Sequence, residues 1–178
     1  MTRPSGWTAT GSLLARIVLR PLALVLSRAA RSSFAQAHIA PRMGPVQLWL
    51  YRRTGGRVQI SALLVPTLLL VSRGARSGAR RETPLMCWPL PDGSFYVAGS
   101  NWGRSPHPSW TWNLLAHPEA EVIFRRRPIP VQADLLEGSQ RSAAWPVLDA
   151  QWPNYRAYEE RSGRPMRIFR LVPVDKLS

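Results

Sequence analysis

Acidic residues are scarce and unevenly placed in this sequence of 178 residues. Only 10 Asp and Glu stand against 24 Lys and Arg, which gives a formal net charge of +14. The first acidic residue is Glu82, and Lys176 is the only lysine. A chain with this charge is expected to bind anions, whether a nucleic acid, an acidic membrane surface or an anionic small molecule.

Other absences exclude whole classes of site. With a single cysteine, Cys87, the chain can form neither an internal disulfide nor a cysteine-based zinc site. The three histidines show no ligand spacing with carboxylates, so we expect no metal. The sequence contains no G-x-G-x-x-G, P-loop or G-x-S-x-G motif and no carboxylate pair in a suitable context. Any enzymatic chemistry is therefore expected to come from a cofactor.

Residues 1–42 are predicted to form a separate basic, partly amphipathic segment. Its apolar run is interrupted by Arg16, Arg20 and Pro21, which makes it too short and too charged for a membrane-spanning helix. It also lacks the small-residue cleavage site of a signal peptide. A helix on an anionic membrane surface, a helix packed on the domain and a disordered tail all fit this pattern. The first of these would place a cytoplasmic protein at the inner face of the cell membrane.

Residues 43–178 have the pattern of one α+β domain. The apolar periodicity predicts strands within 63–71, 82–90, 94–99, 120–125, 129–135 and 167–172, and helices over 46–53, 109–116, 138–151 and 154–161. The strands are spaced as hairpins and do not alternate regularly with helices. A mainly antiparallel barrel with short peripheral helices is therefore expected, and a Rossmann fold is not.

The stretch SRGARSGARRETPL, at 72–85, is the most concentrated basic segment. Gly74 and Gly78 allow a tight turn, and successive backbone amides in such a turn form an anion-binding nest. Four arginines add forked donors for phosphate or carboxylate: Arg73, Arg76, Arg80 and Arg81. An anion site and a solvated hairpin tip both fit this composition.

Two further segments combine aromatic and polar side chains. In GSNWGRSPHPSWTWNLLAHPE, at 99–119, a loop leads into a helix start whose free amides would face a ligand. Trp110 and Asn113 share one face of that helix, which suits either a flat aromatic ligand or the core. In QWPNYRAYEER, Tyr155 and Tyr158 are spaced i, i+3. They are either proton and hydrogen-bond donors at a pocket or ordinary structural tyrosines.

Taken together, these segments resemble the deazaflavin-dependent nitroreductase family of mycobacteria and other actinobacteria. The string G-x-[RK]-S-G-x-x-R-x-T-P-L at 74–85 and the string P-x-W-x-x-N-L-x-x-[HN]-P at 108–118 occur in order within 45–173. The resemblance implies a split β-barrel like that of FMN-binding proteins. It also implies coenzyme F-420, an 8-hydroxy-5-deazaflavin that carries a phosphate and an oligoglutamate tail. The implied activity is hydride transfer from reduced F-420 to a quinone, an activated enone or a nitroaromatic.

The resemblance also assigns roles to individual positions. It assigns cofactor contacts to Arg76, Ser77, Gly78 and Arg81 at the phosphate and tail, to Thr83, Pro84 and Leu85 along the ring, to Ala98, Gly99, Ser100 and Asn101 near the ribityl-phosphate, and to Ser109, Trp110 and Asn113 at the loop–helix contact. Tyr155 and Tyr158 correspond to catalytic tyrosines on the substrate side of the ring. The sequence departs from the family at Ala75, Asn101 and Trp152, where relatives often carry Arg, Lys and Tyr.

Other functions remain open from the sequence. The same barrel could bind a lipid, or the cofactor without turnover. Charge alone would also suit a nucleic-acid binder, but the sequence has neither a recognition helix nor an RNA-binding aromatic motif, so no nucleic-acid partner is expected. The resemblance favours a monomer.

Overall fold

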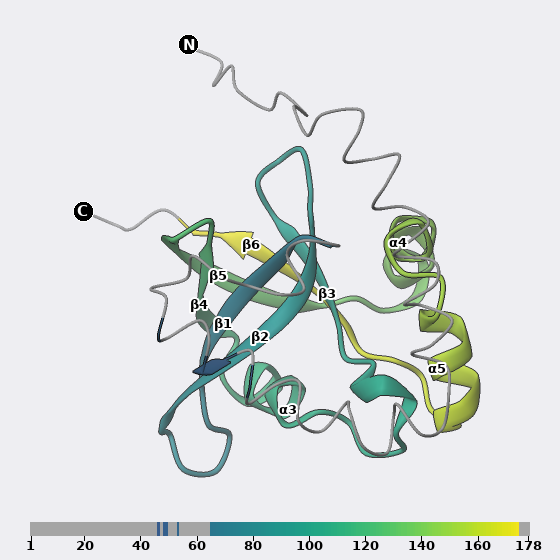
Figure 1. The fold of residues 1–178 in the computed structure, drawn as a ribbon, viewed down its shortest axis with the longest axis horizontal. Helices are drawn as coiled ribbons and strands as arrows, with labels where there is room; N and C mark the ends of the chain where they lie inside the picture. Colours follow the sequence, from purple (N-terminus) through teal and green to yellow (C-terminus); the bar gives the residue numbers. More distant parts are fainter. Residues whose placement is uncertain (1–45, 47, 50–52, 54–64, 175–178) are drawn as a thin grey trace.

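The computed structural model describes residues 46, 48, 49, 53 and 65–174. Six strands form one closed barrel in the order β1-β2-β3-β6-β5-β4, and every neighbouring pair is antiparallel (Figure 1). The strands are β1 (Thr67–Arg73), β2 (Arg80–Pro89), β3 (Phe95–Ala98), β4 (Glu119–Phe124), β5 (Arg127–Leu135) and β6 (Ile168–Pro173). The helices are the 3-10 helix η3 (Asn101–Gly103) and the α-helices α3 (Ser109–Ala116), α4 (Gly138–Gln151) and α5 (Tyr155–Ser162). The predicted antiparallel α+β barrel is confirmed.

Alternating apolar side chains fill the interior of the barrel. Leu68 and Leu70 of β1 are 1% and 0% exposed and belong to one cluster with Cys87 of β2. The other strands contribute Phe95, Val97, Val122, Val131, Ala133, Phe169 and Leu171 to this interior cluster. Burial raises the pKa of the Cys87 thiol, so this cysteine is a neutral core residue. The period-two pattern of each strand therefore determines which side chains face inward.

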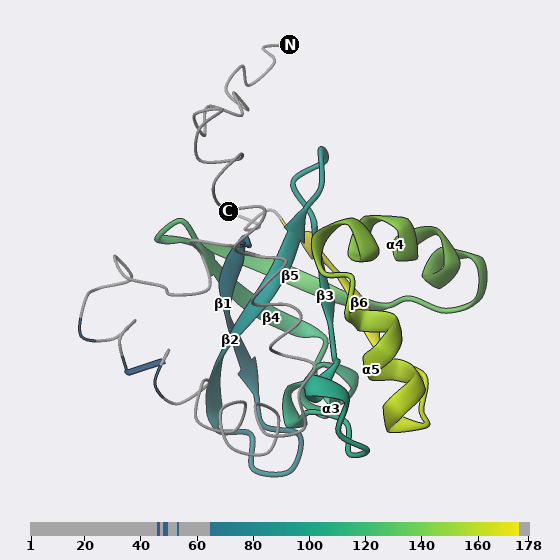
Figure 2. The same ribbon diagram turned by 45° about the vertical axis from the view of Figure 1, so that its right-hand side comes forward.

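A second apolar cluster lies outside the barrel wall, beneath α4 and α5. These two helices lie together on one side of the barrel (Figure 2). Trp145 and Leu148 of α4 and Tyr158 of α5 are buried in this cluster, and Trp152 packs against it, as the helical spacing predicts. From the barrel wall, Met86, Tyr96, Ala98 and Ile168 complete the contact. The wall formed by β2, β3 and β6 is therefore apolar on both faces.

The hairpin turns follow the turn chemistry of the sequence. In the turn at Pro91–Asp92–Gly93, Gly93 has φ +85 and the Asp92 carboxylate accepts hydrogen bonds from the amide and the hydroxyl of Ser94. The β4–β5 link is shorter than the stretch expected between the strands 120–125 and 129–135. Arg127 already pairs with Phe124, which leaves a two-residue turn.

The remaining differences lie in loops and near the N-terminal side. The short helix η3 stands within the stretch 100–108, which was expected to be a loop. The described residues of the predicted helix 46–53 are helical, but Val46 and Trp49 are 49% and 58% exposed. Segment 1–42 and the proposed domain boundary lie outside the described residues. In the described part of the chain, no helix has the length and apolarity to cross a bilayer, and no metal-ligating group of three or more side chains occurs.

Candidate functional site

A tight turn joins β1 to β2 at residues 74–79. The amide of Gly78 donates to the carbonyl of Gly74, and the amide of Gly74 donates to the carbonyl of Ala79, both at 2.8 Å. Gly78 has φ +65, and a Cβ built there would meet nothing within 4 Å. Glycine is therefore favoured at this position by the left-handed backbone rather than by a lack of space.

This turn carries positive charge that is only partly balanced. Arg80 forms an ion pair with Glu82. Arg73, Arg76 and Arg81 are exposed, and no described carboxylate forms an ion pair with any of them. Guanidinium groups that are close together and lack a counter-ion suit a phosphate or a chain of carboxylates.

Asn113 of α3 fixes the position of the turn. Its Oδ1 accepts a hydrogen bond from the backbone amide of Ala75 at 3.0 Å. Its Nδ2 lies 3.4 Å from the hydroxyl of Ser72, at the end of β1. Two predicted elements, the arginine turn and the α3 helix, are therefore brought together by one buried amide side chain.

The start of α3 presents different residues to the core and to the solvent. Pro108 precedes the helix and no side chain caps it, while the carbonyl of Pro108 accepts the amide of Thr111 at 3.0 Å. Ser109 is exposed, whereas Trp110 is buried against Phe169 of the interior cluster, with ring centroids 5.8 Å apart. Trp112 does not share the buried side of the helix and is 51% exposed. The structure thus places Trp110 in the core and Ser109 at the surface.

The predicted ring contacts on β2 lie on both faces of the strand. Thr83, Pro84 and Leu85 are all half-buried. Leu85 packs against the interior cluster, while the next residue, Met86, packs against the cluster under α4 and α5. By strand alternation Thr83 shares the inward side with Leu85, and Pro84 shares the outward side with Met86.

Residues 98–101 connect β3 to η3. Ala98 packs against the α4–α5 cluster, and Gly99 donates its amide to the carbonyl of Arg167 at 2.8 Å. Ser100 is half-buried and precedes Asn101, whose φ of +46 is unusual for a residue with a side chain. The side chain of Asn101 donates to the carbonyl of Pro106 at 2.8 Å, so it stabilises its own loop.

The two predicted catalytic tyrosines are both buried on α5. Tyr155 and Tyr158 are each 3% exposed and belong to the cluster under α4 and α5. Burial raises the pKa of Tyr155 above its ordinary value, and the neighbouring Tyr158 and Cys87 add to the effect. The hydroxyl of Tyr158 is buried and has no hydrogen-bond partner among the described residues. A buried polar group left without a partner is uncommon in folded proteins.

An open depression of about 390 Å³ lies beside the arginine turn. Its lining combines Arg73, Gly78 and Arg80 from the turn with Glu119 and Glu121 of β4. The tyrosine pair does not line it. This depression therefore extends the basic turn toward β4 and does not link the turn to α5.

Comparison with known proteins identifies the family. The model of the F420H(2)-dependent quinone reductase family matches residues 45–173. The chain belongs to this family. Membership confirms the resemblance, the oxidoreductase class and coenzyme F-420, all of which were predicted from the sequence.

Individual members of the family and their structures agree with this assignment. The Mycobacterium tuberculosis protein named "Putative F420H(2)-dependent quinone reductase Rv3178" is 30% identical over 109 residues, which are 60% of this chain and 90% of that protein. The structure of an F420-H2 dependent reductase (FDR-A) has a TM-score of 0.54 and 31% identity, and the match covers 60% of this chain and 93% of that one. A structure described as a domain-swapped dimer has a TM-score of 0.57 and 27% identity, with coverage of 69% and 96%.

The described residues fit the coenzyme of this quinone reductase family. Its phosphate and glutamate tail are anionic, and Arg73, Arg76 and Arg81, in and beside the turn at 74–79, form no ion pair with a described carboxylate. The hydroxyl of Tyr158, on another side of the barrel, is buried and has no hydrogen-bond partner among the described residues. The assignment of coenzyme contacts to individual residues stays a prediction.

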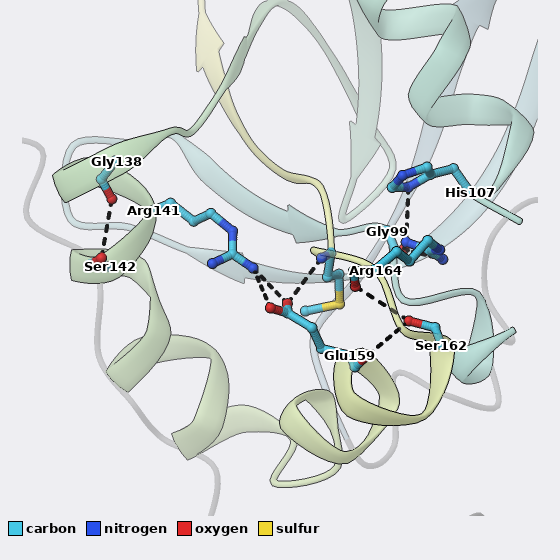
Figure 3. Close-up of polar contacts among 9 residues, drawn as sticks. Gly99, His107, Gly138, Arg141, Ser142, Glu159, Ser162 and Arg164 are labelled. Atoms are coloured by element: carbon cyan, nitrogen blue, oxygen red, sulfur yellow. Dashed lines mark hydrogen bonds and ion pairs between the residues drawn. The ribbon is translucent and has the colours of Figure 1, made fainter. Parts of the chain in front are cut away.

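Sequence reasoning missed two arginines and a histidine around the loop that follows β3. Arg164, in the connector between α5 and β6, donates hydrogen bonds to several carbonyls of this loop, including that of Gly99, and lies 2.9 Å from His107 (Figure 3). Arg161 donates to the carbonyls of Trp102 and Gly103. No motif marks the two arginines, because most of their partners are backbone groups about 60 positions away.

Proposed function

We propose that this protein transfers a hydride from reduced coenzyme F-420 to a quinone. The observation that carries the proposal is the group of Arg73, Arg76 and Arg81 in and beside the turn at 74–79, none of which forms an ion pair with a described carboxylate. Asn113 fixes this turn to α3. Family membership over residues 45–173 supports the same coenzyme. An activated enone or a nitroaromatic has the same electron-poor character and is a secondary acceptor class.

In this proposal Arg76 and Arg81 bind the anionic tail and phosphate. Both are exposed, and neither has a described acidic partner, so binding requires no existing ion pair to break. The coenzyme, when bound, supplies the hydride from C5 of its deazaflavin. The protein's task is to hold this carbon near the acceptor and to stabilise the negative charge that develops on the acceptor oxygen.

Tyr155 and Tyr158 are the proposed donors to that oxygen. They lie one helical turn apart on the buried face of α5. The raised pKa of Tyr155 keeps its hydroxyl protonated, and the hydroxyl of Tyr158 has no other described partner. The Tyr155 hydroxyl is therefore in the form that donates a hydrogen bond.

Titration with oxidised coenzyme F-420, followed by calorimetry, tests the proposal. The wild type is expected to bind, and the double variant Arg76→Ala/Arg81→Ala is expected to lose at least about tenfold in affinity, because charged hydrogen bonds contribute about 1.5–3 kcal/mol. Arg126→Ala is the matched control, since Arg126 is an exposed arginine in another hairpin turn. A wild-type protein that does not bind the coenzyme contradicts the proposal.

A carrier without turnover is the alternative function. It shares the coenzyme site, so binding alone does not distinguish it from a reductase. Reduced coenzyme mixed with the protein and menadione separates the two, because only a reductase oxidises the coenzyme at a rate above the protein-free reaction. Tight binding without oxidation would favour the carrier.

We also propose that the protein is cytoplasmic and binds the membrane surface through segment 1–42. The basic residues of this segment would attract anionic lipids and place the enzyme near membrane quinones. Sedimentation of the full chain with anionic vesicles tests this. Replacing Arg16, Arg20, Arg28 and Arg31 by Gln should release the protein, and equal binding by neutral and anionic vesicles would argue against it.

The proposed oligomeric state is a monomer. One structural relative is described as a domain-swapped dimer, so the alternative oligomeric state is a dimer. Light scattering of the full chain over a range of concentrations distinguishes the two states, and a mass of two chains at every concentration would rule out the monomer.

A further inference from the structure

Every N–H group of the Arg164 guanidinium faces an acceptor on the loop that follows β3. Nε donates to the carbonyl of Ser105 at 2.6 Å. Nη1 donates to the carbonyl of Gly99 at 3.5 Å and to Nδ1 of His107 at 2.9 Å. Nη2 lies 3.4, 3.2 and 3.1 Å from the carbonyls of Gly99, Arg104 and Pro106. Because arginine has five N–H donors, this loop uses all of them.

The histidine contact defines a protonation state. Arginine has no acceptor, so Nδ1 of His107 must accept the hydrogen bond and the ring must be neutral, with its proton on Nε2. Burial and the positive charges of Arg164 and Arg167 lower the pKa of His107, which favours the same neutral form.

The loop that Arg164 holds is conformationally unfavourable on its own. Asn101 and Trp102 have φ of +46 and +57, in the left-handed region that residues with side chains rarely adopt. Arg161 donates to the carbonyls of Trp102 and Gly103 from the end of α5. Such a backbone persists only where surrounding contacts compensate its cost, and the two arginines supply them.

Arg164 is itself supported from α4 and α5. The Glu159 carboxylate accepts two hydrogen bonds from Arg141 of α4, at 2.8 and 2.6 Å, and a third from the backbone amide of Met166 at 3.0 Å (Figure 3). The Ser162 hydroxyl contacts the carbonyls of Glu159 and Arg164. The connector that carries Arg164 is therefore fixed to the helix that carries the tyrosine pair.

We propose that Arg164 is a positioning residue for coenzyme binding, which it controls by fixing the 99–107 loop. This inference rests on the proposed function, because Gly99, Ser100 and Asn101 are the predicted coenzyme contacts in that loop. Arg164 does not bind the coenzyme's anionic groups itself, since its donors are already used by loop carbonyls. The contacts of Glu159 with the Met166 amide and of Ser162 with the Arg164 carbonyl tie the connector that carries Arg164 to α5.

Arg164→Lys tests the role while keeping the charge. A lysine ammonium has three donors on a single nitrogen and cannot reach the spread of acceptors that the planar guanidinium contacts. Arg156→Lys is the matched control, because Arg156 is an exposed arginine of α5 whose partner is Asp149 on α4 rather than the loop.

The first measurement is hydrogen exchange of the protein without coenzyme. The amides of Gly103 and Arg104, which donate to the carbonyls of Ser100 and Asn101, are expected to exchange at least about tenfold faster in Arg164→Lys, with strand amides unchanged. Uniform acceleration over the whole barrel, or no acceleration in the loop, overturns the positioning role.

The second measurement is the affinity for coenzyme F-420 together with the kinetic constants. Arg164→Lys is expected to raise the Kd at least about tenfold, whereas kcat at saturating coenzyme changes by less than about twofold. If the loop amides exchange faster but the Kd is unchanged, the inference about Arg164 is wrong and the proposed function is unaffected. Absence of wild-type binding overturns the proposed function as well, so the two failures are distinguishable.

A milder variant keeps the inference testable if Arg164→Lys does not fold. Glu159→Gln weakens the charged contact to Arg141 but retains an acceptor for the Met166 amide. The same two loop amides should then exchange faster by a smaller factor, and the Kd should rise in parallel. No change in either quantity contradicts the inference.

Discussion

The side-chain carbonyl of Asn113 accepts a hydrogen bond from the backbone amide of Ala75 at 3.0 Å, across 38 positions of the sequence. The basic turn between β1 and β2 is thus anchored by α3, a helix that begins 30 residues after the turn ends. The anchor uses a backbone amide, so the contact does not depend on which side chain occupies position 75. This is why Ala75, where relatives often carry Arg, leaves the anchor in place.

Asn113→Ala should therefore both destabilise the protein and weaken coenzyme binding. It leaves the Ala75 amide without an acceptor in a partly buried position, which costs about 1–3 kcal/mol. Ser72→Ala is the matched control, because it removes only the longer 3.4 Å contact of the same asparagine. Urea unfolding and coenzyme titration measure the two effects. Equal unfolding free energies for the two variants would show that the Ala75 contact does not stabilise the turn.

Gly99→Ala should destabilise the protein through a steric clash rather than through backbone strain. A Cβ at Gly99 would lie 2.8 Å from Cγ2 of Thr111 and 3.3 Å from the carbonyl oxygen of Arg167. Overpacking of this kind costs about 1–3 kcal/mol. Thermal unfolding measures the loss.

A second substitution identifies the clashing atom. Thr111→Ser removes the methyl group but keeps the hydroxyl that donates to the carbonyl of Pro108 and accepts from Arg167. The double variant Gly99→Ala/Thr111→Ser should recover part of the stability lost by Gly99→Ala. If it is no more stable than Gly99→Ala, the methyl contact is not the cause.

Tyr158→Phe should have opposite effects on stability and on activity. The hydroxyl is buried without a described partner, so its removal leaves the free energy of unfolding unchanged or raises it by up to about 1 kcal/mol. If this hydroxyl binds the acceptor oxygen, kcat/KM for menadione falls about 10²-fold or more. Chemical denaturation and steady-state assays give the two numbers. A variant with wild-type turnover removes Tyr158 from the proposed mechanism, as Tyr155→Phe would for Tyr155.

Acid should loosen the 99–107 loop through His107. Neutral His107 accepts a hydrogen bond from Arg164, and the charges that face it are those of Arg164 and Arg167, with Trp112 of α3 edge-on to its ring. Its pKa is lowered from the ordinary 6.5, so below 6.5 the unfolded chain takes up this proton more readily than the folded protein. The stabilisation is therefore complete above pH 6.5 and is lost as the pH falls through the lowered pKa.

His107→Asn provides the control for this pH effect. The amide oxygen of Asn can take the place of Nδ1 as an acceptor, but it does not titrate. In the wild type, the affinity for coenzyme F-420 should fall near the His107 pKa as the pH is lowered from about 8 to about 5. The His107→Asn variant should not show this fall. An identical pH profile in both proteins would show that His107 has no such role.

The strands and helices could be predicted from the sequence because their signals are local. Pro66 sets the start of β1, and Gly93 marks the β2–β3 turn. The two catalytic candidates on α5 share a face simply because they are spaced i, i+3. The spacing of the apolar residues and the identity of the turn residues therefore predict the barrel.

The loop after β3 could not be predicted in the same way. Its shape depends on Arg164, whose acceptors are backbone carbonyls that have no residue-specific signal. The left-handed backbone conformation of Trp102 could not be predicted from the sequence either, because tryptophan has no preference for it. The burial of Tyr155 depends on α4 packing beside α5, which is a tertiary effect. The concentration of basic residues at 72–85 indicated the arginines of the turn. It did not indicate Arg164, which fixes the loop after β3.

The barrel order has a consequence for the synthesis of this protein. β6 pairs with β3 on one side and with β5 on the other, and it follows the other five described strands. The sheet can close only after residues 168–173 have left the ribosome. Until then β3 and β5 expose unpaired edges, which are the surfaces that recruit other chains. We therefore expect nascent chains that end before β6 to depend on chaperones, and release of the complete strand to be the event that makes the protein soluble on its own.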